Sequence, residues 1–442
     1  MDITIEKLIY GGDGLAHHEG STVFVPFVLP AERVSAAPVE RKKKFIRARV
    51  DKLIEPSAGR AVPPCPHFGL CGGCNYQHIA YEAQLQYKTE ILRETLRRLG
   101  HIEWPGEIAA HASPPWSYRN RAQWKVRALD QAAANPSATA SSGEQQGTSL
   151  RIGYFGANST TLRVVDQCAI LSPQLLKTFL AFRQALAAGQ FPRNLREIEA
   201  FAGAGDSKLL ITLTFAGGFP PAKEIAEKVR EIAPELESLL LHDPTRERMD
   251  LAGPGFLQYE AGGSSYRVGH LSFFQVNRFL VDEMVSEIAG NEEGGRLALD
   301  LFAGVGLFSV PLAKRFDRIV AVESNPAAAR DLEFNISSSA EPNRGGIEAR
   351  AMDVEHFLEN FREKADLIVA DPPRAGLSPE VVKQLARIKP ARITYISCEP
   401  PTLARDLAEL LKAGYEISAI CLFDLFPQTF HMESVALLRR IQ

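Results

Sequence analysis

The alternation of hydrophobic and polar positions changes twice along the chain and predicts three regions. Residues 1–57 contain short apolar runs separated by turn signals such as GGDG, which predicts a small β-barrel of the OB-like kind. Residues 58–270 combine a helical-period segment at 81–100 with mixed strands and helices, and predict an α+β domain. From residue 271 onward, apolar runs alternate with helical stretches, which is typical of a Rossmann-like α/β domain with a parallel sheet.

The C-terminal pattern predicts a series of short strands separated mostly by helices. We place them near residues 297–302, 319–323, 348–352, 366–370, 392–397, 417–423 and 435–440. By contrast, residues 131–149 are rich in Ala, Ser and polar residues, and predict a mobile loop within the middle region.

Composition is that of a soluble globular protein, with 45% hydrophobic and 23% charged residues. The sequence has neither a signal-peptide pattern at its start nor a run of eighteen apolar residues, so we expect a cytoplasmic protein without membrane segments. The net charge of −3 is unevenly spread: residues 1–130 hold 18 basic and 14 acidic residues, a balance of +4, which leaves −7 for the remainder. The N-terminal region is therefore the basic part.

Polar residues follow several of the predicted C-terminal strands. Ligands bind at the carboxyl ends of strands in such sheets, which makes Glu323, Asp353 and Asp371 candidate contacts. The first strand ends in ALDLFAGVG, whose glycines allow close backbone approach to a ligand. The loop lacks the third glycine typical of a dinucleotide site, which favours S-adenosylmethionine over NAD. The alternatives are helix caps and surface charges for the acids, and a tight turn for the glycines.

Cys398 follows another predicted strand, in YISCEPPTLARD, where the positive end of the next helix would favour a thiolate. A thiolate that adds to C6 of uracil makes C5 nucleophilic enough to accept a methyl group, after which a base must remove the C5 proton. Glu433, in FPQTFHMESVALL, precedes the last strand and is a candidate base. An inert buried cysteine and an ordinary loop carboxylate are the alternatives.

Three cysteines form a C-x5-C-x2-C pattern at Cys65, Cys71 and Cys74, within a glycine-lined loop. Cys168 is the available fourth thiol. Four thiolates suit an iron–sulfur cluster, whereas zinc would accept either four thiolates or three together with His67 or His78.

Six motifs, SFFQVN, DLFAGVG, VES, DPPR, SCEPPTLARD and HMES, together resemble the RNA 5-methyluridine methyltransferases, in order and over the C-terminal half. The resemblance implies that Cys398 is the nucleophile and Glu433 the proton acceptor. It also implies a 4Fe-4S cluster on the four cysteines named above, and an RNA-binding TRAM domain in the N-terminal barrel. One departure is Leu307, where several relatives carry a polar residue. The implied S-adenosylmethionine contacts are Gln275, Phe302, Glu323, Asp353 and Asp371.

Two basic segments are candidate RNA contacts: residues 41–49, RKKKFIRAR, and residues 114–127, PPWSYRNRAQWKVR. The first fits a solvated strand face equally well. The second interleaves Trp116, Tyr118 and Trp124 with basic residues, which fits either base stacking or an amphipathic strand. We expect methylation of uridine C5 in structured RNA, 23S ribosomal RNA first and tRNA second. Cytosine C5 methylation and a non-catalytic RNA-binding iron–sulfur protein are the alternative functions.

Overall fold

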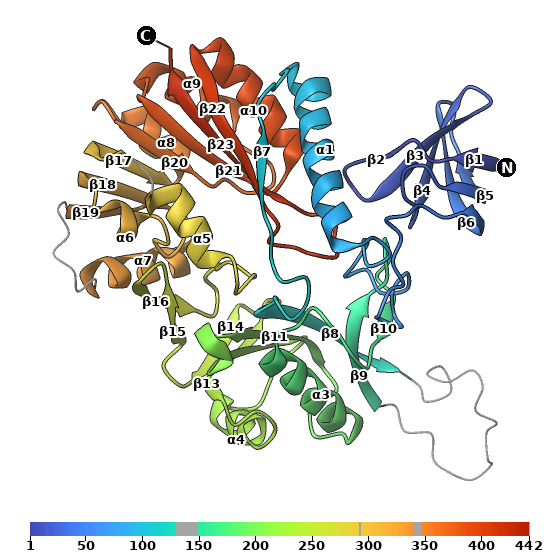
Figure 1. Ribbon diagram of the computed structural model, residues 1–442. Helices are drawn as coiled ribbons and strands as arrows, with labels where there is room; N and C mark the ends of the chain where they lie inside the picture. The colour runs from blue at the N-terminus through green and yellow to red at the C-terminus, as the bar shows by residue number, and fades with distance from the viewer. Residues whose placement is uncertain (130–148, 291–292, 339–345, 442) are drawn as a thin grey trace.

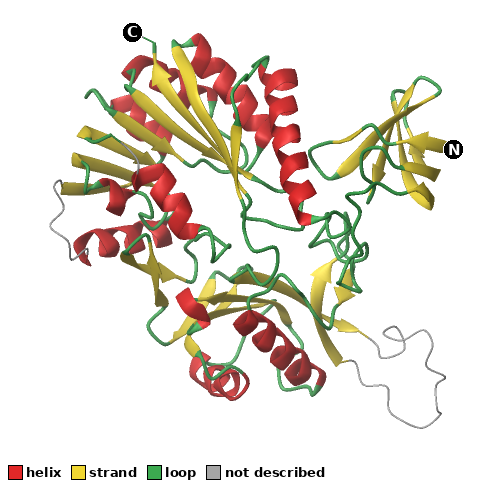
Figure 2. Ribbon diagram, in the orientation of Figure 1, coloured by secondary structure: helices red, strands yellow, loops and turns green. Residues whose placement is uncertain are grey.

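The computed structural model describes residues 1–129, 149–290, 293–338 and 346–441, which form three sheets and a hairpin (Figure 1). The expected mobile loop at 131–149 lies almost wholly outside the described residues. Figure 2 shows strands in all three regions and helices over the middle and C-terminal sheets.

The N-terminal region is a six-stranded sheet in the order β1-β5-β6-β4-β3-β2. The first two strands are successive halves of one extended segment, and they pair with opposite ends of the sheet, which therefore curls into a small barrel. Alternate residues point inward and form a separate core that includes Val23, Val25 and Val34. The strands are β1 (Asp2–Thr4), β2 (Lys7–Leu8), β3 (Asp13–His18), β4 (Ser21–Pro26), β5 (Arg33–Arg41) and β6 (Phe45–Glu55).

The middle region is a seven-stranded sheet in the order β10-β9-β8-β11-β12-β13-β14, with helices α3 and α4 packed on it. Its elements are β8 (Arg121–Leu129), β9 (Ser149–Phe155), β10 (Leu162–Val164), α3 (Pro173–Ala187), β11 (Leu195–Ala202), η1 (Ala204–Asp206), β12 (Leu209–Phe215), α4 (Ala222–Ile232), β13 (Leu236–Asp243) and β14 (Arg248–Ala252). A hairpin of β15 (Phe256–Ala261) and β16 (Ser264–Gly269) leads into the C-terminal region.

The C-terminal sheet has eight strands in the order β19-β18-β17-β20-β21-β23-β22-β7. Five neighbouring strands, β19 to β21 in this order, are parallel, and β23 runs antiparallel between β21 and β22. The strands are β17 (Gly295–Leu301), β18 (Phe316–Glu323), β19 (Gly346–Ala351), β20 (Leu367–Ala370), β21 (Arg392–Ser397), β22 (Tyr415–Phe423) and β23 (Glu433–Arg440). The helices are α5 (Val281–Val285), η2 (Ser286–Gly290), α6 (Ser309–Leu312), α7 (Pro326–Ser338), α8 (Val354–Asn360), α9 (Pro379–Ile388) and α10 (Pro400–Lys412).

Two elements from the range expected for the middle region belong to this C-terminal sheet instead. β7 (Ile108–His111) pairs with β22 as the edge strand, and α1 (Tyr81–Gly100) shares its core with α10 (Figure 1). Helical periodicity places Ile91, Leu92 and Leu96 of α1 on one buried face, but it does not specify which sheet that face covers. No helix in the described ranges is long and apolar enough to cross a lipid bilayer.

Candidate active site

The strand order of the C-terminal sheet brings most of the predicted site residues to one edge. Moving across β19, β18, β17, β20 and β21, the residues at or just beyond the carboxyl ends are, in turn, Asp353, Glu323, Phe302, Asp371 and Cys398. β23 is antiparallel, so its first residue, Glu433, lies at this same edge. Residues separated by as much as 131 positions, 302 to 433, therefore line one edge of the sheet.

The loop after β17 is held against the end of β18. Phe302 has a φ of 64°, a strained conformation for a residue with a side chain, and strain of this kind is concentrated at ligand sites. The N–H of Gly304 donates to Oε2 of Glu323 at 2.8 Å, while Oε1 accepts from Asn325 N at 2.6 Å. Each carboxylate oxygen of Glu323 retains a lone pair that can accept from a ligand hydroxyl.

Asp353 is the N-cap of α8 as well as a strand-end acid. Its Oδ1 accepts from the N–H groups of Glu355 and His356, at 2.8 and 3.3 Å. This is the cap that the sequence left open as an alternative, and Asp353 remains exposed to solvent.

Gln275 is buried in a segment clamped between the middle and C-terminal regions. The N–H of Asn120, in the middle region, donates to the Val276 carbonyl at 3.0 Å, and Asn277 Nδ2 donates to the Leu425 carbonyl of the C-terminal region at 3.2 Å. Leu307, the departure from the family pattern, is buried in the core beneath the β17 loop.

A buried carboxyl that the sequence analysis did not assign lies under this edge. Asp300 of β17 accepts a short hydrogen bond from the Ser309 hydroxyl. Burial, with smaller contributions from repulsion by Asp371 and Glu323, raises the pKa of Asp300 to about 7. Burial likewise raises the pKa of Asp371 to about 7. The signal in the sequence was an aspartate inside an otherwise apolar strand, ALDL.

Cys398 and Glu433 face each other across adjacent strands. Ser397 of β21 pairs with Ser434 of β23, and in an antiparallel ladder the next positions, 398 and 433, are opposite one another. Burial raises the pKa of Glu433 well above its usual value, and Asp371 adds repulsion. The negative charge of Glu433 also raises the pKa of Cys398, so the two groups interact electrostatically.

The pKa of the Cys398 thiol is raised in this conformation, although the start of α10 favours a thiolate. Burial, followed by the nearby Glu433, raises the pKa of Cys398 to about 11, and Arg374 only partly offsets the increase. The partial positive charge at the start of α10 is smaller than the combined effect of desolvation and carboxylate repulsion. The free protein thus holds Cys398 as a thiol. Arg374 lies in the DPPR motif, but its position beside Cys398 was not predicted from the sequence.

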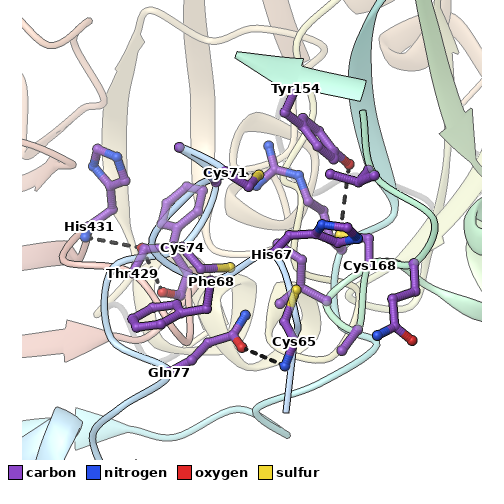
Figure 3. Close-up of a pocket in the computed structure, with 18 of the residues that line it drawn as sticks. Cys65, His67, Phe68, Cys71, Cys74, Gln77, Tyr154, Cys168, Thr429 and His431 are labelled. Carbon is purple, nitrogen blue, oxygen red and sulfur yellow. Dashed lines mark hydrogen bonds between the residues drawn. The ribbon is translucent and has the colours of Figure 1, made fainter. Parts of the chain in front are cut away.

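All four clustered cysteines line a single cavity of about 350 Å³ (Figure 3). Gly72 lets the loop pass close to β9, because a Cβ there would lie 3.0 Å from the Phe155 carbonyl oxygen. Gly73 N–H lies 3.4 Å from Cys71 Sγ, and Tyr154 OH lies 3.8 Å from Cys168 Sγ, so both sulfurs face hydrogen-bond donors.

Burial dominates the acid–base behaviour of these thiols. Burial, with a smaller contribution from the neighbouring sulfurs, raises the pKa of Cys71 to about 11 and that of Cys74 to about 12. Across the described ranges, no group of three or more His, Cys, Asp or Glu residues is arranged so that it could hold a metal ion. His67 also lines the cavity and lies 2.6 Å from Asp166, whereas His78 packs against Phe27 of the barrel.

The cavity reaches the loop before Glu433, a connection that the sequence did not predict. Arg374, Thr429 and His431 line its far side (Figure 3 labels the last two). Burial, followed by Arg374, lowers the pKa of His431 to about 4, so its ring is neutral at physiological pH. The cysteine loop and the Cys398–Glu433 edge are therefore neighbours.

The two candidate RNA segments differ in exposure. Tyr118 and Trp124 are fully buried, so the amphipathic-strand alternative applies to them and neither ring can stack on a base. Arg121 is committed to Glu199 and to backbone carbonyls of residues 270 and 272. In the barrel, Lys43 and Lys44 are exposed, and Arg47 and Arg49 line a groove of about 400 Å³ that continues to Gly72, Phe430 and His431.

Comparison with known proteins agrees with this geometry. Residues 257–441 match the family model for tRNA (uracil-5-)-methyltransferases. An uncharacterized RNA methyltransferase of Aquifex aeolicus is 33% identical over 99% of this chain and 98% of its own. The 23S rRNA (uracil(1939)-C(5))-methyltransferase RlmD of Alkalilimnicola ehrlichii is 31% identical over 100% of this chain and 96% of its own.

A solved structure extends the likeness to the fold of the whole chain. The tRNA (uracil-54, C5)-methyltransferase of Pyrococcus abyssi, in complex with S-adenosyl-L-homocysteine, superposes with a TM-score of 0.74 at 25% identity. The match covers 99% of this chain and 100% of that one. The sheet topology and the full-length relatives lead to one assignment: this chain belongs to the family of RNA (uracil-5-)-methyltransferases.

Proposed function

We propose that the enzyme transfers a methyl group from S-adenosylmethionine to C5 of a uridine in 23S ribosomal RNA, through a covalent bond between Cys398 and uracil C6. The observation that carries this proposal is the position of Cys398 opposite Glu433, next to the row of strand-end acids. The RNA class rests on full-length relatives named for 23S rRNA. Transfer RNA is the second candidate, from the Pyrococcus abyssi enzyme.

The acidic edge of the sheet suits a cationic methyl donor. Asp300, Asp371 and Glu323 are close enough to influence one another, and their mutual repulsion falls when a positive charge binds among them. S-Adenosylmethionine carries a sulfonium and an ammonium group, which supply that charge. Glu323 would accept from the ribose hydroxyls, Asp353 from the adenine amino group, and Phe302 and Gln275 would line the site.

Donor binding also prepares the reacting pair. Burial, together with repulsion from Asp371, raises the pKa of Glu433 and so opposes the ionised form that a base requires. A cation beside Asp371 relieves that repulsion and favours the ionised Glu433. Arg374 favours the Cys398 thiolate in the same way, by opposing the negative charges around it.

Two side chains, Cys398 and Glu433, carry out the reaction. The proton of Cys398 Sγ passes to solvent, the thiolate bonds to uracil C6, and the electron pair of the C5–C6 double bond moves toward O4. C5 takes the methyl group as the bond between carbon and the donor sulfur breaks. Glu433 removes the C5 proton, the C5–C6 double bond forms again, and Cys398 leaves as a thiolate.

We propose that Cys65, Cys71, Cys74 and Cys168 hold a 4Fe-4S cluster, in which each thiolate binds its own iron atom, so that the four need not converge on one metal ion as zinc would require. They line one cavity, and Gly73 N–H faces the Cys71 sulfur, as donors commonly do around cluster sulfurs. Bound metal would deprotonate these thiols despite their raised pKa values. Because methyl transfer moves no electrons, the cluster would brace the loop or contact RNA. Metal and acid-labile sulfide analysis of protein purified without air distinguishes the cluster from zinc.

Basic residues of the barrel would bring the RNA to this edge. The groove that begins at Arg47 and Arg49 ends beside Phe430 and His431, next to Glu433. We propose that the barrel is a TRAM domain that holds RNA backbone phosphates while the target base is turned out of its stack.

Nucleoside mass spectrometry tests the proposal directly. Unmodified 23S rRNA and tRNA transcripts are incubated separately with the purified protein and S-adenosylmethionine, with Cys398→Ala protein as the control. We expect 5-methyluridine in the ribosomal RNA and none with Cys398→Ala. 5-Methylcytidine as the product would favour the cytosine alternative, and binding without methylation would favour the non-catalytic one. The absence of 5-methyluridine from both RNAs would overturn the proposal.

A further inference from the structure

One tyrosine of the barrel reaches the Cys398 loop. Tyr10 precedes the Gly-Gly turn between β2 and β3. Its hydroxyl donates to Oε2 of Glu399 at 2.9 Å and lies 3.4 Å from the carbonyl oxygen of Cys398. Its ring packs edge-on against Phe430, with centroids 5.4 Å apart. Tyr10 thus contacts both the segment that carries Cys398 and the segment that leads to Glu433.

The Gly-Gly turn at residues 11–12 of the barrel packs against these segments. Gly12 has a φ of 93°, and a Cβ there would lie 3.4 Å from the Phe430 ring and 3.5 Å from Asn75. Asn75, in turn, donates its N–H to the Gln428 carbonyl at 2.9 Å. The barrel, the cysteine loop and the segment before Glu433 therefore meet at one point.

Glu399 is the residue through which Tyr10 can act on Cys398. It occupies the N-cap position of α10, yet its side chain makes no cap hydrogen bond and binds the Tyr10 hydroxyl instead. Its backbone is held on both sides, by the Ser397 hydroxyl at 3.2 Å and by the Thr402 hydroxyl at 2.9 Å. Cys398 is thus fixed between two restrained neighbours.

We propose that Tyr10 is a positioning residue for methyl transfer, which holds Cys398 opposite Glu433 from the barrel. The inference rests on the proposed function and adds to it a role for the barrel in the chemical step, separate from RNA binding. Small displacements of a reacting group lower the rate of a positioned reaction strongly. The barrel then helps to hold the reacting cysteine in position.

Tyr10→Phe tests this role, because it keeps the ring against Phe430 and removes only the hydroxyl. Two rates are measured with full-length protein at saturating RNA: single-turnover methylation, and covalent trapping on RNA that contains 5-fluorouracil, whose fluorine blocks the final proton removal. We expect both rates to fall about tenfold, as for the loss of one hydrogen bond to a charged group, with RNA affinity unchanged. The matched control is Tyr87→Phe, whose hydroxyl bonds Ser57 away from the reaction centre, and its rates should equal those of the wild type.

A double-mutant cycle with Glu399→Ala shows whether Tyr10 acts through Glu399. If it does, Tyr10→Phe lowers the rate in the wild-type background and changes it little in Glu399→Ala. Glu399→Gln, which keeps an oxygen acceptor for the hydroxyl, should restore most of the coupling. Equal effects of Tyr10→Phe in both backgrounds would overturn the proposal.

The dependence of the trapping rate on pH distinguishes the positioning of Cys398 from a purely structural role, because a structural role would not shift the profile. The groups that face Cys398 are Glu433, Asp371, Glu399 and the opposing Arg374. The Tyr10 hydroxyl points the positive end of its dipole at the Glu399 carboxylate, so its loss leaves that negative charge less compensated beside Cys398, and the profile should move to higher pH. Unchanged rates, or weaker RNA binding alone, would reject the role of Tyr10. Failure of wild-type protein to trap, or trapping by Cys398→Ala, would reject the proposed function itself.

Discussion

The ammonium group of Lys88 lies 2.6 Å from Oδ1 of Asp424, and both side chains are completely shielded from solvent. Lys88 also donates to the Phe426 carbonyl at 3.1 Å. This buried pair ties α1 to the loop that connects β22 with Glu433, although 336 positions separate the two residues.

Lys88→Met should be strongly destabilising, because it leaves the Asp424 carboxylate buried without its cation. We expect a loss of about 3–5 kcal/mol in the unfolding transition of the C-terminal region. Urea denaturation followed by circular dichroism measures the change. The double variant Lys88→Met/Asp424→Leu should recover much of the loss, since no uncompensated charge remains. Equal destabilisation of the single and double variants would contradict this account.

Glu433→Gln should separate bond formation at Cys398 from product release. The amide cannot take the C5 proton, so ordinary uridine RNA with S-adenosylmethionine should accumulate a covalent protein–RNA adduct. Denaturing gel electrophoresis detects the adduct, and the added Cys398→Ala substitution should eliminate it. Cys421→Ala changes a thiol buried in β22 and should leave adduct formation intact. Free turnover by Glu433→Gln would show that another group is the base.

Affinity for S-adenosylmethionine should rise with pH through neutrality. The pKa values of Asp300 and Asp371 are both raised to about 7, so their carboxylates ionise, and attract the sulfonium, as the pH increases from about 6 to about 8. Calorimetric titration across this interval measures the effect. S-Adenosylhomocysteine lacks the sulfonium charge and should depend less on pH. Asp371→Asn should flatten the profile, and an affinity that falls with pH would refute the electrostatic argument.

Gly72→Ala should disrupt the cysteine cavity, whereas Gly73→Ala should be tolerated. A Cβ at Gly72 would lie 3.0–3.2 Å from backbone atoms of Phe155, Gly156 and Ala157, which cannot move aside as a flexible side chain can. At Gly73 the nearest atom is Cys71 Sγ at 3.5 Å, an ordinary contact. We expect metal content per chain, measured after anaerobic purification, to fall only in Gly72→Ala. Equal metal content in both variants would show that this loop can adapt.

Most of the C-terminal strands were predictable because they are short apolar runs that end at or next to a polar residue. The segments expected near 392–397 and 366–370 are found at Arg392–Ser397 and Leu367–Ala370. The order of the strands was not predictable from periodicity, and this order is what places Cys398 opposite Glu433. The family motifs identified both residues, but only the register indicates their pairing.

Other features depended on long-range packing that local sequence does not encode. Trp124 resembles a stacking residue in the sequence but fills the core of the middle sheet. The raised pKa of Cys398 depends on the distant Glu433 as well as on burial, whereas the start of α10 is a local feature visible in the sequence. The pKa of a group in such a site can be predicted only when all the charged groups around it are known.

The C-terminal α/β region depends on two elements that lie much earlier in the sequence, the edge strand β7 and helix α1. A fragment cut at residue 271 would lack both, and it would expose the open side of β22 together with the apolar surface of α10. Such an edge recruits other strands and promotes aggregation. A shortened protein that keeps the catalytic region intact must therefore contain two separate stretches of sequence, residues 76–111 and the residues from 271 onward.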